Sequence, residues 1–235
     1  MLCFAALLFM ILTKKEDLPL QSLDLFEGDI NGIIQRTAVT NDSNLWPNAR
    51  VPYIIDSSLD GYRYLLAQAM KNYHVNTCIR FVPRTNEEDF VYIFSGKRCS
   101  SKVGRRGKKQ ELSLGPGCRN LGIIVHELGH AVGLYHEHSR YDRDNFLTIL
   151  WDNIKPGMEK QFNKFEPGEI RVLNPFDYNS IMLYGETVFS KDEHLKTMMP
   201  KLKGVQLLGV DKKKRLSKSD IYRLKKLYKC YKKNK

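Results

Sequence analysis

The sequence predicts an α+β fold, in which a region of strands and helices is followed by a long irregular region that ends in a helix. Three observations predict it. Segments rich in β-branched and aromatic residues accompany helical patterns in the first half of the chain. Prolines then interrupt residues 145–216, where no period is visible, and an amphipathic pattern follows near the C-terminus. At 235 residues, 42% of them hydrophobic, the chain can bury one sizeable core.

The expected strands and the first helix follow Pro47. A helix capped by Ser57 or Ser58 should pack on the sheet through apolar side chains at helical spacing. Those side chains are Tyr62, Leu65, Leu66, Ala69, Met70 and Tyr73. Segments with strand composition are residues 51–55, 78–82, 90–94 and, as a short edge strand, 111–114.

Two further helices are predicted. One covers residues 120–132 and should stop at Gly133, because glycine suits a left-handed helix end. The other begins with Ser217 and Asp220 in the spacing of a capping box. Its apolar face consists of Ile221, Leu224, Leu227 and Tyr228.

The N-terminal 36 residues resemble processing segments. Residues 1–13 are almost entirely apolar, precede Lys14 and Lys15, and are too short to span a bilayer, which favours a secretory signal peptide. A buried N-terminal helix is the alternative. Residues 14–36 are short of aromatics and lack a period, so we expect a propeptide that is cleaved after Arg36. The mature domain would then span residues 37–235.

Cysteine parity supports export. Five cysteines become four once Cys3 leaves with the signal peptide, and the remaining four can pair completely. Four cysteines can pair in three different ways. In one of them Cys99–Cys118 closes a local loop and Cys78–Cys230 ties the start of the domain to its end.

A formal net charge of +12 and a pI near 9.4 raise the question of an anionic partner, such as nucleic acid, glycosaminoglycan or an acidic substrate. No nucleic-acid-binding motif accompanies the charge, so most of it is expected to form a solvated face. We predict no nucleic-acid partner and no membrane partner.

The strongest motif is His126-Glu127-Leu128-Gly129-His130. Two histidines four residues apart share one helix face, so both can bind one metal ion while Glu127 points beside them toward the water. Gly133 allows the chain to turn and bring in His136 as a third ligand, which leaves an open position on the ion. This set predicts a catalytic zinc site, since structural zinc sites usually close with a fourth Cys or His.

The run HELGHAVGLYHEHSRYDRD resembles the zinc-binding sequence of the astacin family of metzincin proteases, including Glu137 and Arg140. Ser180-Ile-Met-Leu-Tyr184 resembles the family's Met-turn. The resemblance implies a two-subdomain α+β protease. Its N-terminal subdomain holds a twisted mixed sheet and two long helices, its C-terminal subdomain is irregular and ends in a helix, and Zn²⁺ lies in the cleft between them.

The resemblance also implies a mechanism. Zn²⁺ held by His126, His130 and His136 would polarise the scissile carbonyl, and Glu127 would act as general base and then acid. Met182 would form a floor under the metal. Tyr184 would be a switchable ligand that leaves the metal to stabilise the oxyanion.

Latency is implied by Phe26-Glu-Gly-Asp-Ile30, which resembles the family's propeptide motif. Asp29 would bind zinc in the zymogen in place of water. Cleavage after Arg36 would expose Thr37, whose amino group is expected to meet Glu137.

These features predict a secreted, extracellular zinc endopeptidase that acts as a monomer on proteins or peptides, with extracellular matrix as one candidate substrate, after activation by a trypsin-like protease. The stretch from Tyr184 to Asp192 leans toward arthropod members, including arachnid venom toxins. A secreted binding protein on a protease fold and a nucleic-acid binder are the rival hypotheses.

Overall fold

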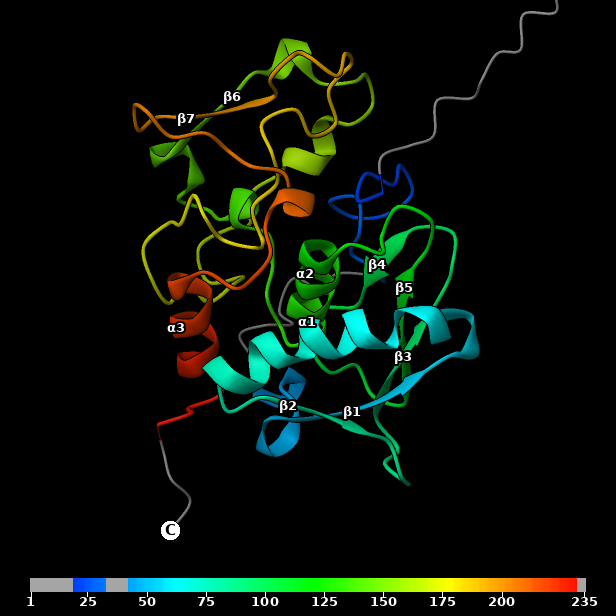
Figure 1. The fold of residues 1–235 in the computed structure, drawn as a ribbon. Coiled ribbons are helices and arrows are strands. Elements are labelled where there is room, and N and C mark those ends of the chain that lie inside the picture. Colours follow the sequence, from blue (N-terminus) through cyan, green and yellow to red (C-terminus); the bar gives the residue numbers. More distant parts are fainter. Residues whose placement is uncertain (1–18, 33–41, 232–235) are drawn as a thin grey trace, which may run out of the picture.

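The computed structural model describes residues 19–32 and 42–231. The predicted signal peptide, Cys3, Arg36 and Thr37 lie outside the described residues. Two regions follow one another along the chain (Figure 1): residues 42–131, here called the sheet region, and residues 132–231, here called the irregular region. None of the described helices combines the length and apolar character that a membrane span requires.

A five-stranded mixed sheet in the order β2-β1-β3-β5-β4 forms the base of the sheet region. All neighbours pair in parallel except β4 and β5, which are antiparallel. The strands are β1 (Arg50–Ile55), β2 (Arg80–Pro83), β3 (Phe90–Phe94), β4 (Cys99–Ser101) and β5 (Lys109–Leu114).

The first three strands confirm the predictions, but the prediction of an edge strand at residues 111–114 is wrong. This segment belongs to β5, which lies between β3 and β4. The edge strand on this side of the sheet is β4, whose Cys-Ser-Ser sequence has no β-branched or aromatic residue to predict it. Pairing of Cys99 with Leu114 fixes β4 on its neighbour.

Helix α1 (Arg63–Asn76) follows a 3₁₀ segment, η3 (Ser57–Tyr62). The cap of this segment is Asp56 rather than Ser57 or Ser58, because the Asp56 carboxylate accepts a hydrogen bond from the Ser58 amide at 2.9 Å. The predicted apolar spacing is otherwise confirmed, since Leu66, Ala69, Met70 and Tyr73 are buried.

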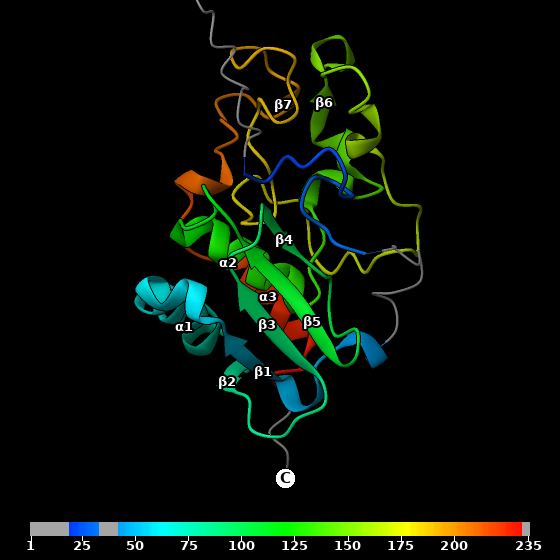
Figure 2. The same ribbon diagram turned by 90° about the vertical axis from the view of Figure 1, so that its right-hand side faces the viewer.

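Helix α2 (Leu121–Ala131) lies beside α1 on one face of the sheet (Figure 2). Ten of its eleven residues are buried, so protein covers the helix on all sides, including the side that carries its two histidines. The hydroxyl of Tyr73 on α1 donates to the Val125 carbonyl of α2 at 2.5 Å. The core therefore holds α2 from every side.

The irregular region consists of turns, short 3₁₀ segments, a small antiparallel pair and one helix, as the prolines predicted. The pair is β6 (Leu147–Ile149) with β7 (Met198–Pro200), and the helix is α3 (Lys218–Leu227). Ser217 and Asp220 form the predicted capping box on α3. Disulfides join Cys78 to Cys230 and Cys99 to Cys118, one of the three connectivities that the sequence allowed.

Candidate active site

Helix α2 brings His126 and His130 to one face, and both side chains are fully buried. The helix begins at Asn120, whose side chain accepts a hydrogen bond from the Gly122 amide at 2.8 Å. Just after its C-terminal end, Gly133 has φ of +103°, and the following amide of Leu134 donates to the Gly129 carbonyl. This left-handed turn reverses the chain and brings His136 back to the helix.

The Nε2 atoms of His126, His130 and His136 form a triangle with sides of 3.1, 3.2 and 3.2 Å. Three nitrogens bound to one tetrahedral Zn²⁺ at about 2.0–2.1 Å would lie about 3.3 Å apart, so the triangle fits this ion.

The other ring nitrogens have protein partners. Nδ1 of His126 donates to the Ile181 carbonyl at 2.7 Å, and Nδ1 of His130 donates to the Leu134 carbonyl at 2.8 Å. Nδ1 of His136 contacts the carboxylate of Glu27. A proton on each Nδ1 leaves all three Nε2 lone pairs free for a metal.

Asp29 approaches the triangle from the N-terminal segment. Its Oδ2 lies 2.9 Å from Nε2 of His126, and its Oδ1 lies 3.4 and 3.3 Å from those of His130 and His136. Oδ1 is buried and has no hydrogen-bond partner among the described residues, which is what a fourth metal ligand requires. The donor set of three imidazoles and one carboxylate suits Zn²⁺.

Glu127 lies next to the first ligand and is completely buried, and neither of its carboxylate oxygens has a hydrogen-bond partner among the described residues. Burial raises the pKa of Glu127 well above its usual range, and the charge of Asp29 adds to the effect. A carboxyl group with a raised pKa next to a metal site has the character of a general base and acid.

The turn from Ser180 to Tyr184 packs beneath the triangle. Met182 is fully buried, and its sulfur lies so close to Gly129 that a Cβ added there would be 2.7 Å away. The Tyr184 hydroxyl lies 2.6 Å from Asp29 Oδ2. Burial, followed by the Asp29 charge, raises the pKa of Tyr184 well above its usual value, so this phenol keeps its proton.

Comparison with known proteins decides the family. The model of the Astacin peptidase family matches residues 38–229. The chain belongs to the astacin family. This astacin is 46% identical over 230 residues to astacin-like metalloprotease toxin 1 of Loxosceles intermedia, an alignment covering 94% of this chain and 87% of the toxin. It is 40% identical to toxin 2 of the same spider, over 88% of this chain and 83% of that protein.

A solved structure of another family member has a similar fold. High choriolytic enzyme 1, a hatching enzyme zinc-protease from the medaka Oryzias latipes, matches with a TM-score of 0.73 and 36% identity, over 86% of this chain and 100% of that one. The predicted α+β family fold is thus confirmed. Membership makes this protein a zinc endopeptidase, a hydrolase of protein and peptide substrates.

The N-terminal segment of this astacin is fastened to its edge strand. The Ser101 amide of β4 donates to the Asp29 carbonyl at 3.0 Å, and the Asn31 amide donates to the Ser101 carbonyl at 2.9 Å. Gly28 has φ of +92°, and a Cβ there would lie 2.3 Å from the Leu20 carbonyl oxygen. Only glycine fits this bend, which turns Asp29 toward the histidines.

Two groups of contacts in this astacin were not predicted from the sequence. Glu27, from the same motif as Asp29, contacts His136. Asp220, predicted only as a helix cap, also accepts hydrogen bonds from the Ser180 hydroxyl at 2.6 Å and the Ile181 amide at 2.8 Å. The one signal in the sequence was an acidic residue on an otherwise basic helix, and the capping box already explained it.

Proposed function

We propose that this astacin is a secreted zymogen, in which residues 14–36 hold a zinc endopeptidase silent through Asp29. The observation that carries the proposal is the Asp29 carboxylate, which lies within 2.9–3.4 Å of three histidine Nε2 atoms. A substrate carbonyl has to approach the same point. The two disulfides support secretion, because such bonds persist in oxidising compartments.

In the proposed active form, His126, His130 and His136 hold Zn²⁺, which supplies a Lewis acid when bound. Glu127 accepts a proton from the attacking water and delivers it to the leaving amine. Once Asp29 has left, the Tyr184 hydroxyl is free to donate to the developing oxyanion. Met182 supports the ligands from below.

Activation is proposed to follow cleavage after Arg36 by a trypsin-like protease, with residues 37–235 as the catalytic domain. We propose that the active enzyme is a monomer with protein substrates, extracellular matrix among them. The names of the two Loxosceles relatives suggest a venom setting.

The proposed inhibition by Asp29 can be tested with the unprocessed precursor. Asp29→Ala should cleave casein without any processing, because the blocking carboxylate is gone. The wild type and the control Asp24→Ala, which changes an exposed carboxylate of the same segment, should stay silent until trypsin is added. Combination with Glu127→Ala identifies the activity as the protein's own. Silence of unprocessed Asp29→Ala with zinc bound would contradict the proposed switch.

A further inference from the structure

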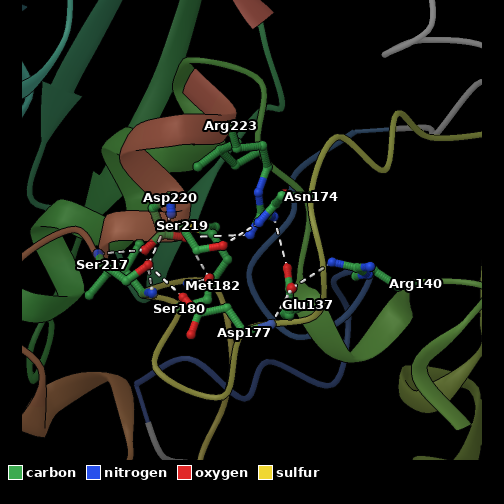
Figure 3. Close-up of polar contacts among 12 residues, drawn as sticks. Glu137, Arg140, Asn174, Asp177, Ser180, Met182, Ser217, Ser219, Asp220 and Arg223 are labelled. Atoms are coloured by element: carbon green, nitrogen blue, oxygen red, sulfur yellow. Dashed lines mark hydrogen bonds and ion pairs between the residues drawn. The ribbon is translucent and has the colours of Figure 1, made fainter. Parts of the chain in front are cut away.

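Arg223 of α3 is a buried cation that the proposed mechanism does not use. Only 8% of the residue is exposed. Its Nη1 atom lies 2.8 Å from Oε2 of Glu137, and its Nη2 atom lies 3.5 Å from Oδ1 of Asp220 (Figure 3). A helix near the C-terminus thus reaches the residue that directly follows the third histidine.

The Glu137 carboxylate is fully buried and already has several partners. Its Oε1 atom accepts hydrogen bonds from Nη1 of Arg140 at 2.8 Å and from the Asp177 amide at 3.0 Å. Arg140 and Arg223 approach it from different directions (Figure 3). A buried carboxylate needs charged partners. While the N-terminal segment is still in place, Arg140 forms a hydrogen bond with Oε1, and Arg223 forms an ion pair with Oε2 that lacks hydrogen-bond geometry.

Little room remains beside this ion cluster. The adjoining pocket has a volume of about 30 Å³ and is lined by Leu134, Arg140, Asn174, Arg223 and Leu227, among others. A space of this size holds ordered water. In the precursor it is Arg223 that lies next to Oε2 of Glu137.

Helix α3 is also linked to His126 through the Met-turn. Asp220, the neighbour of Arg223, accepts a hydrogen bond from the Ile181 amide, and the Ile181 carbonyl accepts one from Nδ1 of His126. The Glu137 amide donates to the Met182 carbonyl at 3.0 Å. Polar contacts from α3 therefore reach the Met-turn and the segment of His136 together.

We propose that Arg223 is a positioning residue that neutralises Glu137 within the precursor, so that the zinc site is set before processing and does not need the amino group of Thr37. This inference rests on the proposed zymogen function and specifies how it is regulated. Processing then has one task, the removal of Asp29, and the exact position of the cut becomes unimportant.

The test combines a change of the chain end with a change of Arg223. Two precursors, one native and one with a glycine inserted between Arg36 and Thr37, are activated by trypsin, and mass spectrometry verifies their N-termini. Their kcat/KM values on a peptide substrate should agree within about twofold. In Arg223→Gln the amine is the remaining cation for Oε2 of Glu137, so the inserted glycine should lower kcat/KM at least fivefold. A fivefold loss in the wild-type background would overturn the proposal.

A second readout uses the unprocessed precursor and requires no activity. Arg223→Gln should lose zinc to a chelator at least fivefold faster than the wild type, whereas Arg223→Lys, which keeps the charge, should lie between them. Lys226→Gln, a charge change on the exposed face of α3, should match the wild type. If Arg223→Gln does not fold, Arg223→Lys against Lys226→Gln carries the same comparison. Equal rates of zinc loss in all variants would reject the role of Arg223, even if the processed protein proved inactive for another reason.

Discussion

The sheet region and the irregular region each contribute to the zinc site, but they hold their residues by different means. His126, Glu127 and His130 sit on one helix buried in an apolar core. His136, Met182 and Tyr184 sit on turns, and hydrogen bonds to Asp220 of α3 and to Lys213 help to hold the turn that carries Met182 and Tyr184. Local periodicity is sufficient for the first arrangement. The second depends on contacts between residues about forty positions apart.

The largest expected effect separates the chemistry of the two regions. Glu127→Ala in the processed enzyme should lower kcat/KM about 10⁴-fold, at the upper end for a proton-transfer group, because two proton transfers depend on it. Tyr184→Phe should lower kcat/KM about 10²-fold, since it removes one donor to the oxyanion. Steady-state kinetics on one peptide measures both. A larger loss of kcat/KM for Tyr184→Phe than for Glu127→Ala would mean that the irregular region supplies the more important catalytic group.

The disulfides provide the next comparison, in stability. Cys78–Cys230 joins the two regions across 152 residues, whereas Cys99–Cys118 closes 19 residues within the sheet region. The loop-entropy relation gives about 5 kcal/mol for the first and about 3 kcal/mol for the second. Urea unfolding of the two paired Cys→Ser variants should follow that order. The reverse order would mean that the irregular region does not need its covalent link.

Two glycines of α2 lie where the sheet region packs against the irregular region, so substituting them tests how tight this packing is. A Cβ at Gly122 would lie 2.1 Å from the Lys213 carbonyl oxygen, and one at Gly129 would lie 2.7 Å from the Met182 sulfur. A backbone oxygen cannot yield as a flexible thioether can. Gly122→Ala should therefore lower the free energy of unfolding by about 3 kcal/mol and Gly129→Ala by about 1 kcal/mol. An alanine that stabilises the protein at either site, as in an isolated helix, would show a loose interface.

The smallest expected effect concerns acid stability within the sheet region. Hydrogen bonds from Ser58, followed by that from Tyr92, lower the pKa of Asp56 to about 2. Between this pKa and the ordinary value of 3.8 the unfolded chain binds more protons, so the contribution of Asp56 to stability is present above that range and is lost as the pH falls through it. Asp56→Asn should flatten the dependence of the melting temperature on pH between about 4 and 2. If the slope of melting temperature against pH did not change, groups other than Asp56 would cause the loss of stability in acid.

Much of the sheet region was predictable because its structure follows local patterns. The spacing of Leu66, Ala69, Met70 and Tyr73 predicted α1, and the distance between His126 and His130 predicted a shared helix face. Strand β4 was missed because its small polar residues owe their conformation to pairing with β5 and to a disulfide. Tertiary context decides such a segment, whatever its composition.

The irregular region was predictable only as irregular, apart from α3. Asp29 and Tyr184 were identified through the family resemblance, because nothing local distinguishes them from an ordinary turn aspartate and a core tyrosine. The contacts of Asp220 and Arg223 could not be predicted, since a capping box explains the first residue and solvent exposure is the default for the second.

The bond between Cys78 and Cys230 has a further consequence if the chain is cut. The two cysteines are 152 positions apart, and their bond closes the chain between them into a covalent ring. A single cut in an exposed turn of that ring opens it without releasing a fragment. His126, His130, His136, Glu127 and Tyr184 all lie inside the ring, so a nicked molecule keeps all the proposed metal-binding and catalytic residues in one covalently linked chain.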